Sequence, residues 1–458
     1  MNYIISLLLF LLFLFYLIKK NSNSIKRKTL VIAFAGKIVA SISVWYIYTY
    51  YFSNTSLNDI YKYFNDGKIL NDSFIKNPIE TIKFIINGNS NEIRIFTSNL
   101  QYWTKPNQYG LLNDNQTIIL INFLLCFVSN NNLLIQSIII ASISFYATLV
   151  LYRSIQSHFS IPNKILFLFM FFNPCYLIWT SGNFKETFIY IGLMFLFSNI
   201  IRLQNNFKNN KLHLFIFINL LFVLFCKNYF FIFLIPGIIA LYINIYIWKN
   251  VKLISISYIT FLLIVIFAGL FHNPVNFENT IKDPIKRKLF IKKVNSESYE
   301  KNALGQNRNI FEVLRFKQRD QQFEAWKQNA HTVIYAPTLD GNPITFLKCI
   351  PFALINTIFR PNIIDLKNPL FIPDILINLI VIILILFSIK YRKSKFPNQE
   401  KGLVTLILYF TIISIILIGI LVPILGNIVR YRAPIIPLLI IALLTMIDFE
   451  KIPLLNKL

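Results

Sequence analysis

The chain has 458 residues, of which 55% are hydrophobic and 14% are charged, and its formal net charge is +25. About a quarter of the residues in soluble globular proteins are charged, so this composition excludes an ordinary soluble protein. The apolar runs are continuous and do not alternate over about 10 residues, which excludes an outer-membrane type of β-barrel. The composition therefore indicates an all-α fold, a polytopic transmembrane helical bundle.

The positive charge is explained by its distribution. Basic residues gather in short segments between the apolar runs, as the positive-inside rule requires of cytoplasmic loops. The positive charge therefore does not indicate nucleic acid as a partner, and we expect the protein to contact membrane lipids. The four cysteines form no CxxC pair and the four histidines are scattered, so the sequence predicts neither a disulfide framework nor a zinc site.

Eleven apolar segments approach the roughly 20 residues that cross a bilayer as a helix. The predicted spans are 2–18, 29–52, 133–152, 165–180, 184–201, 212–226, 230–248, 253–271, 371–389, 403–421 and 433–447. Basic residues follow the first run and do not precede it, so we expect the N-terminus outside and, after an odd number of spans, the C-terminus in the cytoplasm. The chain is then a single transmembrane domain over 1–458, placed in the inner membrane of a bacterium.

Two long polar segments, 53–115 and 272–343, are predicted to be extracytoplasmic loops. The first contains apolar residues at near-helical spacing, which predicts a short amphipathic helix at the membrane interface. These residues are Leu57, Ile60, Tyr61, Phe64 and Leu70. The apolar segments 117–128 and 344–359 follow the two loops. The first is too short for a span and the second is interrupted by Lys348 and Pro351, so we expect both to be interfacial helices, with a re-entrant helix as the alternative at 117–128.

The first loop carries two candidate catalytic carboxylates, Asp59 and Asp66. A spacing of seven residues places them on one face of a helix, about 10 Å apart. A carboxylate near the membrane surface can accept a proton from an attacking hydroxyl or bind a divalent cation. The alternative is that both are solvated residues on the polar face of an amphipathic helix, with Lys62 as an ion-pair partner.

Basic residues at three other places are candidates for binding a phosphate. Lys185 and Glu186 stand at the outer start of a span, where Lys185 could hold a phosphate or where Asn183 and Glu186 could form a capping box. Arg360 closes the second loop, and Arg430 and Arg432 precede the last span. Arginines on the outer side oppose the positive-inside bias and suit bidentate phosphate binding, although lipid headgroup contact would also explain them. Lys37 lies inside a span, where it would snorkel or face the bundle interior.

Three motifs together give the chain a resemblance to GT-C-type integral membrane glycosyltransferases, and more narrowly to multi-pass proteins of bacterial envelope polysaccharide biosynthesis. The motifs are Asn58-Asp59-Ile60-Tyr61-Lys62-Tyr63 in the first loop, Ser181-Gly182-Asn183-Phe184-Lys185-Glu186 at a middle span, and Arg430-Tyr431-Arg432-Ala433-Pro434 before the last span. The resemblance is one of layout and extends over most of the chain. It departs from the family in the extra apolar segment before the first loop and in the absence of a paired Asp-Asp or Asp-Glu.

The resemblance implies an extracytoplasmic active site, a polyprenyl-phosphate-linked sugar donor and a glycan or lipid acceptor. It implies an aspartate of the first loop as general base or metal ligand, which by position is Asp59 first and Asp66 second. A divalent cation, Mg²⁺ or Mn²⁺, would then be a cofactor held by Asp59. It also implies that Lys185, Arg430 and Arg432 bind the lipid phosphate, with Glu186 and Arg360 as further substrate-binding candidates.

Two other classes of function remain open. A polysaccharide polymerase or ligase of the O-antigen or capsule type would depend on Arg430, Arg432 and the loop 272–343, and would not need Asp59. A transporter or flippase would normally carry ionisable residues at mid-membrane and repeated halves, whereas this sequence shows only Lys37 and no internal repeat.

Overall fold

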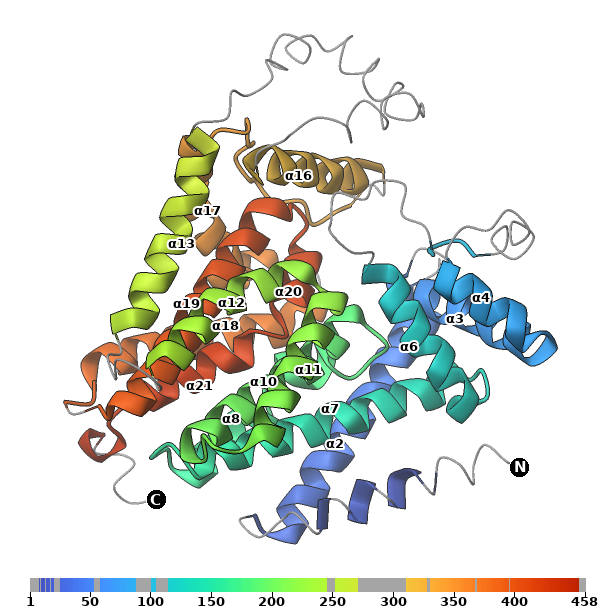
Figure 1. Cartoon of the computed structure of the whole chain (residues 1–458), viewed down its shortest axis with the longest axis horizontal. Helices are drawn as coiled ribbons and strands as arrows, with labels where there is room; N and C mark the ends of the chain where they lie inside the picture. The colour runs from blue at the N-terminus through green and yellow to red at the C-terminus, as the bar shows by residue number, and fades with distance from the viewer. Residues whose placement is uncertain are drawn as a thin grey trace.

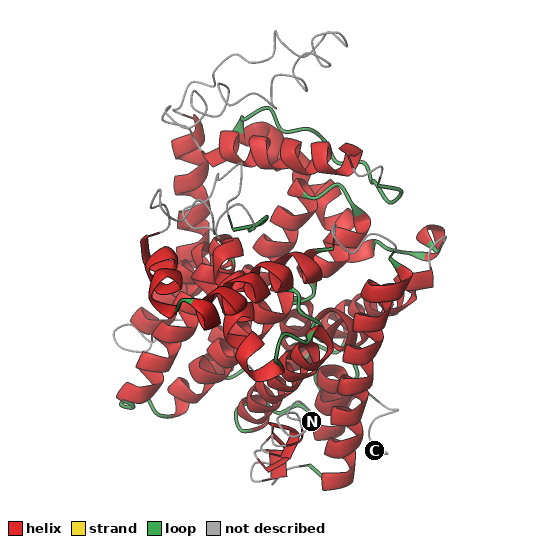
Figure 2. Ribbon diagram, turned by 90° about the vertical axis from the view of Figure 1, so that its right-hand side faces the viewer, coloured by secondary structure: helices red, strands yellow, loops and turns green. Residues whose placement is uncertain are grey.

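The computed structural model describes residues 25–52, 58–87, 100–103, 114–244, 252–270, 310–327, 330–366, 369–394 and 396–452, and single positions between 8 and 19. Across these residues the protein is all-helical, with two isolated β-bridges and no strand (Figure 2). This confirms the all-α class. The predicted span 2–18 lies mostly outside the described residues, as do 272–309 of the second predicted loop and parts of the first.

Five helical segments are long and apolar enough to cross a membrane, which confirms the broad class of membrane protein. They are Arg27–Tyr51, Leu133–Gln156, Lys185–Asn205, Pro369–Lys390 and Glu400–Leu421. A sixth candidate is a bent pair, Leu425–Arg432 with Ile436–Met446. The described residues thus give five or six candidate spans, fewer than the eleven predicted. One reason is that apolar helices such as α11 (Asn210–Cys226) and α12 (Asn228–Ile243) are too short to qualify by length.

Two apolar stretches of the chain contain a break. As expected from Asn173-Pro174, the predicted fourth span divides into α8 (Asn163–Phe171) and α9 (Pro174–Trp179), and the Asn173 side chain caps α9 by accepting from the backbone N–H of Cys175. The predicted last span, 433–447, contains one helix, α21 (Ile436–Met446). A second helix, α20 (Leu425–Arg432), precedes it and meets it at 60°, with Pro434 in the break, because proline cannot donate the backbone hydrogen bond that would continue the helix.

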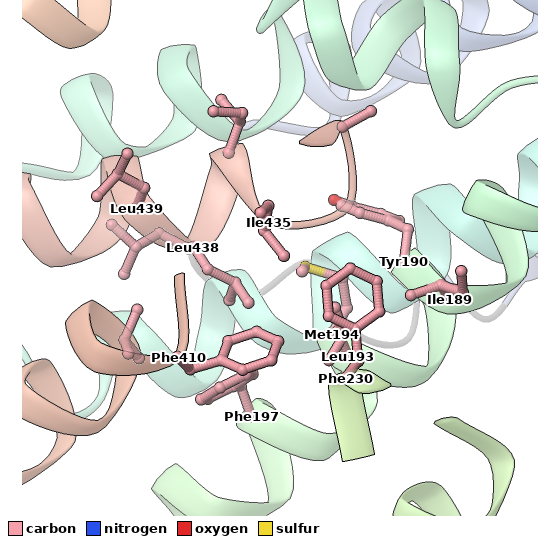
Figure 3. Close-up of a cluster of buried hydrophobic side chains, with 14 of the residues drawn as sticks. Ile189, Tyr190, Leu193, Met194, Phe197, Phe230, Phe410, Ile435, Leu438 and Leu439 are labelled. Atoms are coloured by element: carbon pink, nitrogen blue, oxygen red, sulfur yellow. The ribbon is translucent and has the colours of Figure 1, made fainter. Parts of the chain in front are cut away.

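The centre of the bundle is formed by α7 (Leu133–Gln156) and α10 (Lys185–Asn205), with α2 (Arg27–Tyr46) on its outside. Helix α10 packs against α7 and α11, and α2 packs against α7 (Figure 1). A buried apolar cluster joins these middle helices to the C-terminal ones, with Phe197 of α10, Phe230 of α12, Phe410 of α19 and Leu438 of α21 gathered together (Figure 3). Segments far apart in the sequence are therefore held in one core.

The first predicted loop contains the amphipathic helix that the spacing indicated. Helix α3 (Asp59–Lys76) buries Ile60, Phe64 and Leu70, while Leu57 lies outside the described residues. It packs against α6 (Asp114–Ser129) at Gly67, where an added Cβ would lie 2.7 Å from the Cβ of Asn122. This close approach sets α3 firmly on α6 and so positions the residues at its N-terminus.

The remaining helices complete the C-terminal half and the ends of the bundle. They are η1 (Ile47–Tyr51), α4 (Pro78–Asn87), α13 (Lys252–Leu270), α16 (Ile310–Lys327), α17 (Pro343–Leu354), η6 (Ile355–Phe359), η7 (Ile363–Asp365), η8 (Pro369–Phe371), α18 (Ile372–Lys390), α19 (Asn398–Leu421) and η9 (Phe449–Lys451). Helix α17 with η6 covers the predicted interfacial segment 344–359, and α6 covers the predicted segment 117–128. Both are apolar helices below span length, as their sequences indicated.

Candidate functional site: a charged cluster at the ends of four helices

The central contact of the site joins Asp59 and Arg430, which are 371 positions apart in the sequence. Asp59 is the first residue of α3, and Arg430 lies in the last turn of α20. The guanidinium Nη2 of Arg430 donates to Oδ2 of Asp59 at 2.7 Å. The fold therefore brings a carboxylate of the first predicted loop onto an arginine that precedes the last span.

Two further charged residues contact this ion pair. The Nε of Arg430 lies 3.6 Å from Oε1 of Glu186, the second residue of α10, and the Nζ of Lys62 lies 3.6 Å from Oδ1 of Asp59. Glu186 is buried, with 5% of its side chain exposed, whereas Asp59 is 31% exposed. Arg430 thus has a protected carboxylate at one edge and a more accessible one at the other.

Lys185 forms a second pair beside the first. Its Nζ lies 2.8 Å from Oδ2 of Asp114 and donates to Oδ1 of Asn115 at 3.0 Å. The hydroxyl of Tyr63 donates to the same Asn115 oxygen at 3.3 Å. Asp114 is the first residue of α6, where the positive end of the helix dipole favours a carboxylate. This second pair adds α6 to the helices that meet at the site.

Aromatic rings border the charged groups. Lys227, between α11 and α12, lies 4.8 Å from the centroid of Tyr431, and the Arg430 guanidinium lies 5.2 Å from the same ring. Lys62 lies 5.1 Å from the ring of Tyr102. Such cation–π contacts hold basic side chains in place while leaving their N–H groups able to donate elsewhere.

The electrostatics of the cluster favour the ionised form of Asp59. Burial alone would raise its pKa, but the positive charges of Arg430, Lys62 and Lys185 outweigh burial and hold the pKa of Asp59 below its ordinary value. Burial, together with the charges of Asp59 and other acids, raises the pKa of the Tyr63 hydroxyl well above its ordinary value. Tyr63 therefore remains a hydrogen-bond donor.

The capping alternative for Lys185 and Glu186 is wrong. Helix α10 begins at Lys185 with Phe184 as its N-cap, and no side chain caps it. The amide of Asn183 instead donates to Oδ1 of Asn122 in α6. A capping box requires the N-cap three residues before the acid. Here the N-cap is Phe184, only two residues before Glu186, because α10 starts one residue later than the pattern needs.

Asp66 stands apart from the cluster. Its side chain is 1% exposed, and its two oxygens accept from the backbone N–H groups of Gln101 at 3.1 Å and Tyr102 at 2.7 Å. Burial raises the pKa of Asp66, although these amide donors partly offset the increase. The interpretation of Asp66 as a solvated surface residue is wrong, because the carboxylate holds the segment 100–103 against α3.

Arg360 and Arg432 also lie apart from the Asp59–Arg430 pair. Arg360 forms a bidentate ion pair with Asp365, its neighbour in η7. Arg432 is fully buried and its Nη1 donates to the backbone carbonyls of Thr357 and Arg360. Of the three arginines predicted to bind phosphate, the structure brings only Arg430 to the carboxylates.

Sequence reasoning missed the residues that complete the cluster. Asp114 and Asn115 stand at the boundary between the first polar segment and an apolar one. This position indicated the end of a loop and gave no sign that the two residues contact Lys185. Lys227 is the single residue between α11 and α12. The predicted topology places this lone lysine on the outer side, against the positive-inside bias, and this signal could have found it.

A divalent cation does not fit at Asp59. Within the described ranges, no group of three or more His, Cys, Asp or Glu side chains could hold a metal ion. Mg²⁺ binds several oxygen ligands, yet Asp59 and Glu186 both face the guanidinium of Arg430, whose charge would repel the ion.

The cluster as a whole suits an anion better than a cation. Four basic side chains, Lys62, Lys185, Lys227 and Arg430, outnumber the three carboxylates of Asp59, Glu186 and Asp114 where α3, α6, α10 and α20 meet. Such groups can bind a phosphate and serve a reacting hydroxyl next to it. No protein-family model, curated protein or solved structure matches this chain.

Proposed function

We propose that the protein is a GT-C-like membrane glycosyltransferase, which transfers a sugar from a polyprenyl-phosphate-linked donor to a glycan or lipid acceptor in envelope polysaccharide or glycoconjugate assembly. The Asp59–Arg430 ion pair is the observation that carries this proposal. It joins a candidate base with a candidate phosphate ligand, although the two residues come from opposite ends of the chain. Glu186 and Lys185 of α10 lie next to the same pair.

Each member of the cluster has a role in this reaction. The acceptor hydroxyl attacks C1 of the donor sugar and gives its proton to the Asp59 carboxylate. As the new C–O bond forms, the bond between C1 and the phosphate oxygen breaks, and the electron pair leaves on the phosphate. Arg430 stabilises that developing negative charge by bidentate hydrogen bonding, and Glu186 fixes the guanidinium from its buried side.

Replacement of the proposed base tests the function directly. We expect Asp59→Asn to reduce sugar transfer in membranes about 10²- to 10⁴-fold, the usual contribution of a general base. Asp72→Asn is the matched control, because Asp72 lies on the same helix, is exposed, and accepts a hydrogen bond from Asn131. Both variants should insert and accumulate like the wild type. Full transfer activity in Asp59→Asn would remove Asp59 from the catalytic role.

The glycan that accumulates in cells distinguishes the main alternative, a polysaccharide polymerase or ligase. Arg430 favours this alternative as well, because a polymerase must also bind the phosphate of a lipid-linked substrate. Loss of one sugar from the repeat unit in the Asp59→Asn strain supports transfer. An intact single repeat without long chains, together with normal function of Asp59→Asn, supports polymerisation.

The proposed location is the bacterial inner membrane, with the charged cluster on the extracytoplasmic face and the C-terminus in the cytoplasm. Basic residues support this orientation, because Lys390 ends α18 and Arg392 and Lys393 follow it, away from the N-terminal end at which Asp374 contacts Trp179. A periplasm-active reporter inserted after Lys62 should be active, and one at the C-terminus inactive. A cytoplasmic Lys62 would contradict the use of an extracytoplasmic donor.

A further inference from the structure

The acids of the cluster are held by its bases. Asp59 contacts Arg430 and Lys62, Glu186 contacts Arg430, and Asp114 contacts Lys185. Three carboxylates thus face three basic side chains in direct ion pairs. A phosphate that enters this arrangement meets a guanidinium whose outer edge already binds a carboxylate.

This pairing conflicts with the two roles that transfer requires. A carboxylate that accepts a 2.7 Å hydrogen bond from a guanidinium is a poor proton acceptor, because the positive charge stabilises its ionised form. A guanidinium that uses Nη2 on that carboxylate cannot present the same N–H group to a phosphate. The observed pair is therefore a resting arrangement, in which Asp59 is held in its ionised form and one edge of the Arg430 guanidinium is occupied.

The two edges of Arg430 differ in a way that shows which contact can open. Asp59 is 31% exposed, so water can solvate its carboxylate after it leaves the guanidinium. Glu186 is 5% exposed, and separation from Arg430 would leave a buried carboxylate without this compensation. Arg430 itself is 12% exposed, so the edge at Asp59 is the accessible one.

We infer that the donor phosphate displaces Asp59 from Arg430, so that donor binding itself releases the base for the acceptor hydroxyl. This inference rests on the proposed function and concerns how the same site is regulated. Glu186 remains on the guanidinium and keeps it oriented toward the phosphate, while Lys62 stays with Asp59. The resting enzyme then has no free base beside the donor site and cannot activate water or an acceptor before the donor is bound.

Displacement makes Asp59 a competitor of the phosphate, and this has a measurable consequence. Removal of the Asp59 charge should tighten phosphate binding even though it slows transfer. A base that acts independently of Arg430 would leave binding unchanged. The other charged or titratable groups around the pair, Tyr48, Tyr63, Asp114, Lys185 and Tyr431, are present in both states and do not produce this difference.

Binding of farnesyl phosphate to the purified full-length protein tests the exchange. We expect Asp59→Asn to bind this probe about tenfold more tightly than the wild type, a change that corresponds to one close charge pair. Arg430→Gln should bind it much more weakly than the wild type. Inorganic phosphate should bind far more weakly than farnesyl phosphate if the ligand is a lipid phosphate, and equally well if the site takes free phosphate.

A double mutant separates exchange from a general effect of charge. In the Arg430→Gln background, the added Asp59→Asn substitution should give no further tightening, because the pair no longer exists. Asp72→Asn, which removes one charge from the exposed part of α3, should bind like the wild type. Unchanged or weaker binding in Asp59→Asn, or tightening that persists without Arg430, overturns the exchange alone. If neither the wild type nor Asp59→Asn binds farnesyl phosphate, the proposed donor is overturned together with the exchange.

Discussion

Arg430 and Arg432 are two residues apart on the same short helix, yet they belong to different regions of the molecule. Arg430 faces the carboxylates of Asp59 and Glu186, and Asp59 is the more exposed of the two. Arg432 is fully buried and donates to the backbone carbonyls of Thr357 and Arg360. Charges that meet other charges near the surface can serve chemistry, whereas charges that meet the backbone inside the bundle hold the fold.

Other residues divide in the same way. Lys185 belongs with Arg430, because it pairs with the carboxylate of Asp114. Lys37 belongs with Arg432, because its buried Nζ donates to the carbonyl of Tyr176 and the hydroxyl of Thr180 across the helices. Lys37 faces the bundle interior, which is the second of the two positions expected for it. The α9 segment that it binds leads directly into α10 and its Lys185–Glu186 pair.

The largest expected effect comes from Arg432. We expect Arg432→Met to destabilise the protein by about 3–5 kcal/mol, because the substitution removes the donor to the buried carbonyl of Thr357 and the partly buried carbonyl of Arg360, and removes the positive charge next to Asp374. The yield and melting temperature of purified protein measure this loss. Arg430→Lys is the matched control, because it keeps a positive charge beside the buried Glu186 but loses the planar guanidinium, and it should fold while losing transfer. Equal stability of the two variants would remove the distinction between the regions.

Asp66 should show the next largest effect on stability. Asp66→Ala removes a buried acceptor from the N–H groups of Gln101 and Tyr102, and each charge-assisted hydrogen bond contributes about 1.5–3 kcal/mol. Protease sensitivity near residues 100–103 and the melting temperature should both report the release of this segment. Asp59→Ala, seven residues earlier on α3, should melt closer to the wild type. If Asp66→Ala keeps its stability but loses transfer, Asp66 has the catalytic role instead.

Local patterns in the sequence were sufficient to predict several parts of this arrangement. Apolar spacing predicted α3, and Asn173-Pro174 predicted the break between α8 and α9. The resemblance assigned Asp59 and Arg430 to one site, and the two side chains form a direct ion pair. These features depend on short-range periodicity, or on the rule that charges outside the membrane gather at its faces.

The separate positions of Arg430 and Arg432 could not be predicted in the same way. The motif Arg430-Tyr431-Arg432 looks like a pair of equivalent arginines if the segment is extended. Once the segment is a helix, residues two positions apart point about 200° away from each other. The helical state of this segment depends on the bend before α21, and the partner of Lys185 depends on how α6 packs on α3. Both are set by tertiary contacts that no local pattern encodes.

The smallest expected effect is a difference in the pH dependence of stability between Asp59 and Asp66. Because the basic neighbours hold the pKa of folded Asp59 below about 3.9, the unfolded value, its contribution is present above that pH and is lost as the pH falls. Burial raises the pKa of folded Asp66, so the pH dependence has the opposite sign: ionisation of this carboxyl costs stability as the pH rises through the raised value, although its hydrogen bonds remain. Melting temperatures of the wild type, Asp59→Asn and Asp66→Asn between about pH 3 and pH 7, a range that brackets the ordinary carboxylate pKa values, measure both pH dependences. The gap between wild type and Asp59→Asn should narrow toward low pH, and a gap that widens there would show that Arg430 does not stabilise the ionised carboxylate.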